Sequence, residues 1–130
     1  MHTKEINSRL DFVSIQVRDI QKSEKFYRKI LGFKLSNYQN SDATVFQNEA
    51  GAVFAVRKPF APLSENQPLG FGVSLWFGWV DNIESLETYL ESKGVIILKS
   101  LYNTPFGKSI TIADPDGYAI TLHQVDSHEN

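Results

Sequence analysis

The chain has 130 residues, of which 42% are hydrophobic and 22% charged, and its formal net charge is −2. This is the length of one domain, and the composition is too apolar for a disordered chain. The nearly balanced charge argues against nucleic-acid binding, and no run approaches the ~20 apolar residues that a membrane span requires. The absence of cysteine excludes disulfides and thiolate catalysis. We therefore expect a cytoplasmic protein with neither nucleic acid nor membrane as a partner.

Residues 10–58 predict a β-α-β-β-β unit, which we call module one. Apolar and polar residues alternate over 12–18, which indicates a strand with two distinct faces. A helix should follow, with Asp19 suited to cap its first turn and Gly32 suited to end it. Three short strands are then expected at 33–35, 43–47 and 52–57.

A connector with three prolines, residues 58–70, leads to module two, residues 71–125, and a polar tail, residues 126–130. Module two repeats the first pattern, because Asn82 follows the first helix cap by 63 positions and Gly94 follows the first helix-ending glycine by 62. A period found only twice indicates a pair of modules in a single domain, 1–130; the alternative is chance likeness between two α+β stretches. Its strands are expected at 75–80, 95–98, 109–113 and 119–125.

Two segments carry a resemblance to a known family. Val17–Tyr27, continuing to Leu31–Phe33, and Asp114–Ile120, with Phe106-Gly107 upstream, resemble the signatures of the vicinal oxygen chelate superfamily. This superfamily comprises the glyoxalase, bleomycin-resistance and extradiol-dioxygenase proteins. The resemblance covers Leu10 to Gln124. It implies an α+β fold in which two pseudo-symmetric β-α-β-β-β modules form a half-open curled sheet, or cup, and it implies a homodimer. Pairing of the modules within one chain or between chains is left open.

The same resemblance implies four metal-ligand positions in the metal-dependent members, on the first and last strands of each module. His, Glu or Gln normally fill them. In this chain they are occupied by Phe12, Ala55, Thr121 and Leu75, or by Ser74 in a register shifted by one residue. Phenyl, methyl and isobutyl groups donate no lone pair, and a threonine hydroxyl is a weak neutral ligand. We therefore expect neither a metal nor another cofactor.

Strand alternation predicts the lining of the cup. An aromatic and apolar surface with a few polar groups suits a small, partly aromatic molecule. The structural alternatives are that Phe12 fills space, that Arg57 is a solvated rim charge and that part of the aromatic run at 76–79 belongs to the core. The predicted lining residues are Phe12, Ser14, Gln16, Phe54, Arg57, Leu75, Phe77, Trp79, Thr121 and His123.

Of the three histidines, His123 is the candidate for catalysis, because His2 and His128 lie near the chain ends. Asp114 and Asp116 lie in the segment Asp114-Pro115-Asp116-Gly117 and are interpreted as turn formers.

Three functions remain. The first is metal-free binding of a small molecule, including drug sequestration. The second is a metal-dependent lyase, isomerase or dioxygenase with displaced ligands, starting from His123 and Gln16. The third is a non-catalytic regulatory or assembly module with a cup filled by its own side chains.

Overall fold

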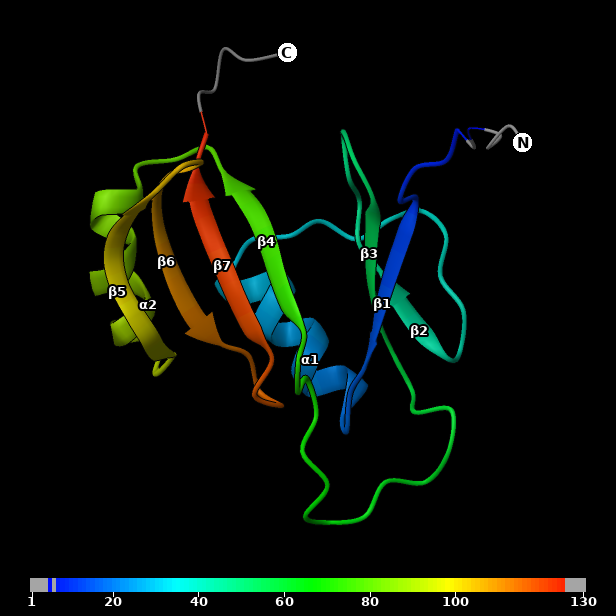
Figure 1. Ribbon diagram of the computed structural model, residues 1–130. Coiled ribbons are helices and arrows are strands. Elements are labelled where there is room, and N and C mark those ends of the chain that lie inside the picture. Colours follow the sequence, from blue (N-terminus) through cyan, green and yellow to red (C-terminus); the bar gives the residue numbers. More distant parts are fainter. Residues whose placement is uncertain (1–4, 6, 126–130) are drawn as a thin grey trace.

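The computed structural model describes residue 5 and residues 7–125 and contains two separate β-sheets (Figure 1). His2, His128 and the expected polar tail lie outside the described residues. The first sheet has the order β1-β3-β2, with β1 (Phe12–Gln16) parallel to β3 (Val53–Arg57) and β2 (Ala43–Val45) antiparallel to it. The predicted α+β fold of two modules is confirmed.

The helix of module one begins as predicted. The Asp19 carboxylate accepts hydrogen bonds from the backbone N–H groups of Gln21 and Lys22, at 3.0 and 3.2 Å, and so caps α1 (Ile20–Lys25). The helix continues as a π-helical segment, η1 (Phe26–Ile30), and ends at Gly32, whose φ of 80° lies in the left-handed region.

The strand predicted at 33–35 is wrong: only an isolated bridge joins Leu35 to Phe46. The Gln39 side chain explains part of this difference. Its amide nitrogen donates to the Val45 carbonyl at 2.8 Å and its amide oxygen accepts from the Val45 N–H at 3.0 Å. The Val45 carbonyl still accepts from the Ser36 N–H at 2.9 Å, so the Gln39 side chain takes up only the Val45 N–H, which a longer neighbouring strand would use.

Module two forms the second sheet, in the order β4-β7-β6-β5. β4 (Ser74–Trp79) is parallel to β7 (Ala119–Gln124), and β6 (Gly107–Ala113) pairs antiparallel with both β7 and β5 (Ile96–Thr104). A 3₁₀ turn, η2 (Ile83–Ser85), and helix α2 (Leu86–Ser92) cover one face. The Asn82 side chain caps this helical segment by accepting from the Glu84 N–H at 2.9 Å.

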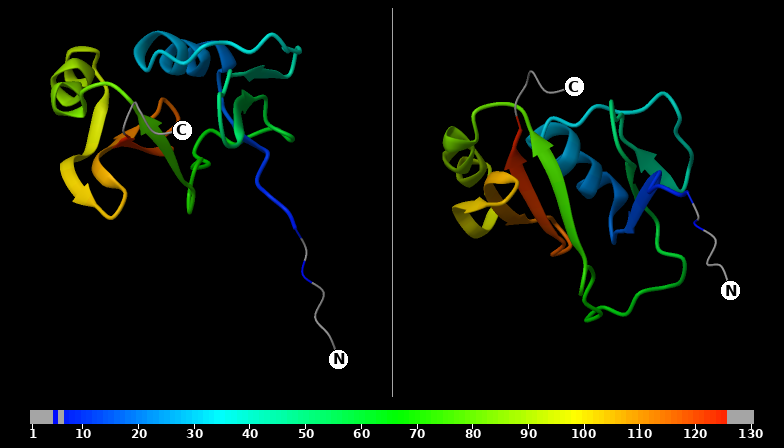
Figure 2. Two further views of the ribbon diagram at one scale, coloured as in Figure 1. Left: turned by 90° about the horizontal axis from the view of Figure 1, so that it is seen from above. Right: turned by 45° about the horizontal axis from the view of Figure 1, so that its top comes forward.

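The two modules share one hydrophobic core on the helix side of both sheets. Phe77 of β4 contacts Phe33 and Phe54 of module one, each with ring centroids 5.1 Å apart. Tyr89 of α2 donates to the Ile30 carbonyl at 2.8 Å. Figure 2 shows from above that α1 and α2 lie on the same side of the two sheets, so the opposite face of each sheet, which we call its outer face, is left uncovered by the helices. The two outer faces of one chain are therefore separate surfaces.

No helix in the described part of the chain is both long and apolar enough to cross a membrane.

Candidate functional site

The register of β4 decides which side chains face outward in module two. Ser74 lies opposite Ala119, Trp76 opposite Thr121 and Gly78 opposite His123. The prediction that Leu75, Phe77 and Trp79 share a face with Thr121 and His123 is therefore wrong. These three side chains lie half-buried against the core, on the helix side of the sheet. The strand follows the shifted register that begins at Ser74, and a shift of one residue moves every side chain to the other face.

Three aromatic rings gather on the outer face of module two. Trp76 of β4, His123 of β7 and Phe106 of the β5–β6 turn have ring centroids 5.8 to 6.5 Å apart. Trp76 is 43% exposed and Phe106 is 69% exposed, although large apolar side chains are normally buried. The Trp76 indole N–H donates to the Ser74 hydroxyl at 3.1 Å, which fixes the orientation of the ring. We call Trp76, Phe106 and His123 the aromatic cluster.

Hydroxyl groups lie next to the aromatic cluster on the same face. The Tyr102 hydroxyl is 2.8 Å from the Thr111 hydroxyl, which is 2.7 Å from the Thr121 hydroxyl. Three hydroxyl protons serve two hydrogen bonds, so one O–H remains to donate at an end of the chain. Lys99 places its ammonium 4.0 Å from the centre of the Tyr102 ring. This face therefore combines exposed aromatic surface, a spare donor and one cation.

His123 is confirmed on the outer face of β7, beside Trp76. Its Nδ1 is shielded from solvent and makes no hydrogen bond to the described residues. A buried polar atom without a partner costs about 1–3 kcal/mol. No carboxylate or second imidazole contacts His123 in the part of the chain that the structure describes, so no acid–base pair is formed there.

The outer face of module one carries Phe12, Ser14, Gln16 and Arg57, as the alternation predicts. Phe12 is 51% exposed. The Gln16 amide oxygen accepts from the Phe60 N–H at 2.8 Å, and the Arg57 guanidinium lies 3.9 Å from the centre of the Phe60 ring. The connector thus holds both polar residues at the rim.

Gln16 and His123, the pair considered for catalysis, are not hydrogen-bonded to each other: the Gln16 amide oxygen accepts from the Phe60 N–H, and His123 Nδ1 has no partner among the described residues. The Gln16 carbonyl accepts from the Tyr118 hydroxyl at 2.6 Å, at the beginning of β7. His123 lies five residues further along the chain, roughly 16 Å from Tyr118 at the rise of a β-strand.

A hollow between the modules collects Phe54, Leu75 and Phe77 of the predicted lining, whereas Trp79 lines neither of its two cavities. Two cavities, of about 410 and 430 Å³, share Phe54, Phe77 and Gly78 in their walls, and Leu75 lines the second. Phe54 stacks on Phe46 at 5.8 Å and belongs to the core cluster. These apolar residues therefore lie together on the opposite face of the sheets from Thr121 and His123, although Ser74 and Trp76 of the outer face also line the second cavity.

The residues at the four metal-ligand positions do not fit a divalent cation. Phe12 offers a phenyl ring, Ala55 a methyl group, and Ser74 and Thr121 neutral hydroxyls. The Thr121 hydroxyl is already hydrogen-bonded. No group of three or more His, Asp or Glu side chains that could hold a metal occurs among the described residues.

The turn at 114–117, which we call the closing turn, joins the two modules, and its two aspartates do not form an acid–base pair. Asp114 accepts from the Tyr27 hydroxyl at 2.7 Å and from the N–H groups of Asp116 and Tyr118 at 2.9 Å. Burial raises the pKa of Asp114, and burial also raises the pKa of Tyr27. The interpretation of Asp114 as a turn former agrees with these bonds.

Sequence reasoning missed several outer-face residues. Ser74 was named as the alternative in the shifted register, but Trp76, which follows from the same shift, and Phe106, which precedes Gly107 in the family motif, were not assigned to the site. Bulges in β5 break the alternation around Lys99 and Tyr102, so no simple pattern pointed to them.

Comparison with known proteins gives the family. The model of the Glyoxalase/Bleomycin resistance protein/Dioxygenase superfamily matches residues 9–122. Lactoylglutathione lyase of Schizosaccharomyces pombe is 31% identical over 142 residues, covering 88% of this chain but 46% of that protein, so this chain spans less than half of its length. Phenazine antibiotic resistance protein EhpR of Enterobacter agglomerans is 26% identical over 116 residues, covering 86% of this chain and 88% of that protein.

The fold agrees with these matches. The antibiotic-binding protein TnmS3 of Streptomyces sp. CB03234 superimposes with a TM-score of 0.70 at 24% identity, over 93% of this chain and 98% of that one. The two modules, their closing turn and the family match together make this chain a member of the Glyoxalase/Bleomycin resistance protein/Dioxygenase superfamily.

Proposed function

We propose that this chain binds a small, partly aromatic molecule on the outer face of module two, as a homodimer and without a divalent metal. The observation that carries the proposal is the exposure of Trp76 and Phe106 beside His123 on one sheet face. Each aromatic contact with a planar ligand contributes about 0.5–1.5 kcal/mol beyond area burial. The resistance function of EhpR, a relative similar over most of both chains, supports sequestration of an aromatic compound.

The homodimer is proposed because the two outer faces of one chain do not face each other. A second copy can place the outer face of its module one, with Phe12 and Arg57, over the aromatic cluster. Such an arrangement covers apolar side chains that are half exposed in one chain. It also encloses the ligand between two sheets, where small-molecule sites are normally found.

Absence of a metal from the binding step is proposed from the donor set. Phe12, Ala55, Ser74 and Thr121 supply neither charge nor an imidazole to a divalent cation. Binding through stacking and a few hydrogen bonds needs neither.

The test uses phenazine as a planar aromatic probe. We expect it to bind the wild type and to quench tryptophan fluorescence, and we expect Trp76→Ala to weaken binding about tenfold or more. Trp79→Phe is the matched control, because Trp79 lies on the core side of the same strand. Equal binding by Trp76→Ala and the wild type would place the ligand elsewhere, and the first inter-module cavity, which Phe46, Phe54 and Phe77 line and Trp76 does not, would be the site to examine.

A metal-dependent enzyme is the second candidate, favoured by the likeness to lactoylglutathione lyase. Its ligands would have to start from His123, and the Gln16 amide oxygen already accepts from the Phe60 N–H. Metal analysis of protein purified without a nickel column distinguishes the two functions. A stoichiometric divalent ion that is lost in His123→Ala would support the enzyme and contradict metal-free binding.

A further inference from the structure

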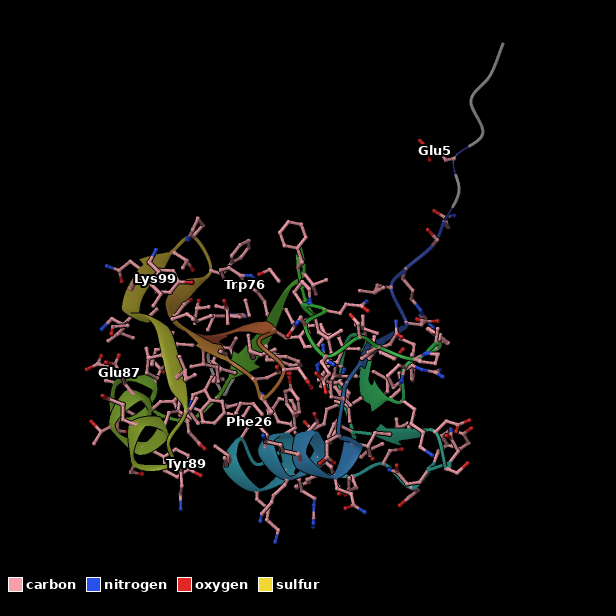
Figure 3. The ribbon with its side chains drawn as sticks, turned by 90° about the horizontal axis from the view of Figure 1, so that it is seen from below. Glu5, Phe26, Trp76, Glu87, Tyr89 and Lys99 are labelled. Carbon is pink, nitrogen blue, oxygen red and sulfur yellow. The ribbon has the colours of Figure 1, made fainter. Side chains whose placement is uncertain are left out.

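One row of side chains crosses the outer face of module two. Lys99 of β5 lies opposite Thr111 of β6, Thr111 opposite Thr121 of β7, and Thr121 opposite Trp76 of β4. Neighbouring strands are about 4.8 Å apart, so the row spans roughly 14 Å between the first and last Cα atoms. In Figure 3, Lys99 and Trp76 lie on the side of the sheet away from α1. The row therefore has a cation at one end and an aromatic platform at the other.

The polar groups between these ends can donate to an acceptor. The Tyr102 ring lies below the Lys99 ammonium, and its hydroxyl begins the chain that runs through Thr111 to Thr121. Thr121 is only 2% exposed, so the spare O–H is open to a ligand at the Tyr102 end of that chain, beside the ammonium, and both groups are donors. An oxygen-rich group of a ligand that stacks on Trp76 would meet donors from two residues.

The charged side chains of the described strands that lie on the outer faces are all positive. Among the strand residues described, the charged side chains at outer-face positions are Lys99 in module two and Arg57 in module one. The acidic groups near β5 lie on the helix side of the sheet. Glu87 of α2 accepts from the Ser100 hydroxyl and the Leu101 N–H, and Glu84 pairs with Lys108 at 2.7 Å. A cationic ligand would meet no carboxylate at these strand positions.

Resting on the function proposed above, we infer that the ligand is an aromatic anion, a planar ring system that carries a carboxylate. Its rings stack on Trp76 and Phe106, and its carboxylate accepts from the Lys99 ammonium and the Tyr102–Thr111–Thr121 hydroxyl chain. Charge-assisted hydrogen bonds are stronger than neutral ones, and enclosure by a second sheet removes competing water. Preference for the anion is therefore set by Lys99, while the stacking is set by Trp76.

The experiment compares three probes with one ring system and different charge: 2-naphthoate, 2-naphthamide and 2-naphthylmethylammonium. Binding is measured by calorimetry at fixed pH and ionic strength. We expect 2-naphthoate to bind about tenfold more tightly than the amide, and the cation to bind most weakly. Lys99→Gln should remove the preference for the carboxylate without changing the affinity for the amide.

Lys93→Gln is the matched control, because Lys93 also lies over a tyrosine ring, that of Tyr89, at 5.8 Å, but next to α2. It should keep the preference. Equal affinities for the three probes, or tightest binding of the cation, would overturn the aromatic anion and leave the proposed binding function standing. Failure of all three probes and of phenazine to bind would instead contradict the binding function.

Discussion

Trp76 and Trp79 show how one strand gives two tryptophans different roles. Trp76 lies on the outer face, where it contacts Phe106 and His123. Trp79 packs against the core, and its indole N–H is buried without a partner among the described residues. The proposed binding site depends on the first ring and not on the second, although both are large aromatic residues three positions apart.

The carboxyl of Asp114 gives a prediction about pH. Burial raises its pKa from the ordinary 3.8, against the opposing effect of the donors on Tyr27, Tyr118 and Asp116. Because the folded-state pKa is above the unfolded one, the stability that Asp114 contributes is fully present below 3.8 and is lost as pH rises through the folded value. We therefore expect the wild type to gain stability relative to Asp114→Asn as pH falls from neutral toward that window.

Urea unfolding of the wild type and Asp114→Asn across this pH range measures the difference directly. A difference that is constant, or that favours the variant increasingly as pH falls, would show that the buried carboxyl does not resist ionisation.

At the scale of elements, local signals explain what the sequence could predict. The caps at Asp19 and Asn82 and the glycines at 32 and 94 are set by short-range backbone chemistry, and each was found at its expected place. The face of β4 was wrong because a run with apolar residues on both sides of the strand leaves the register undetermined. The true length of β5 was hidden by two irregularities near Lys99. The strand expected at 33–35 is reduced to a single bridge beside Val45, whose N–H donates to the Gln39 side chain.

The candidate site was less predictable than the fold for the same reason. Thr121 and His123 were placed on the outer face correctly because β7 alternates cleanly. Phe54, Leu75 and Phe77 instead meet in the inter-module hollow, since the modules join through their helix-side faces. No local pattern encodes that packing.

The connector supplies a prediction at this scale. Gly70 has a φ of 79°, and a Cβ there would lie 2.7 Å from a ring carbon of Tyr118. Gly72 has a φ of 77° but nothing within 4 Å of its Cβ position. Both alanine variants incur the left-handed backbone cost of about 1–2 kcal/mol, and Gly70→Ala adds a steric clash of about 1–3 kcal/mol. Urea unfolding should therefore rank Gly70→Ala as the less stable variant.

Equal stability of Gly70→Ala and Gly72→Ala would mean that Tyr118 moves aside freely. That result would contradict its fixed position, in which the hydroxyl binds the Gln16 carbonyl at 2.6 Å.

At the scale of the whole molecule, the separation of the outer faces predicts the assembly. Large side chains that a single chain leaves exposed include Phe12 and Trp76 on these faces, at 51% and 43%. We expect sedimentation equilibrium at micromolar concentration to give twice the chain mass of 14.7 kDa. A mass of one chain at that concentration would contradict a site completed by a second copy.

Metal-free binding is proposed because phenyl, methyl and hydroxyl groups occupy the four positions at which the family resemblance implies metal ligands. Calorimetric titration of phenazine into protein dialysed against EDTA, and into the same protein after addition of zinc, manganese or nickel, tests it most directly. We expect phenazine to bind with the same affinity and stoichiometry in every sample. Binding that disappears after dialysis and returns with one of the metals would contradict it.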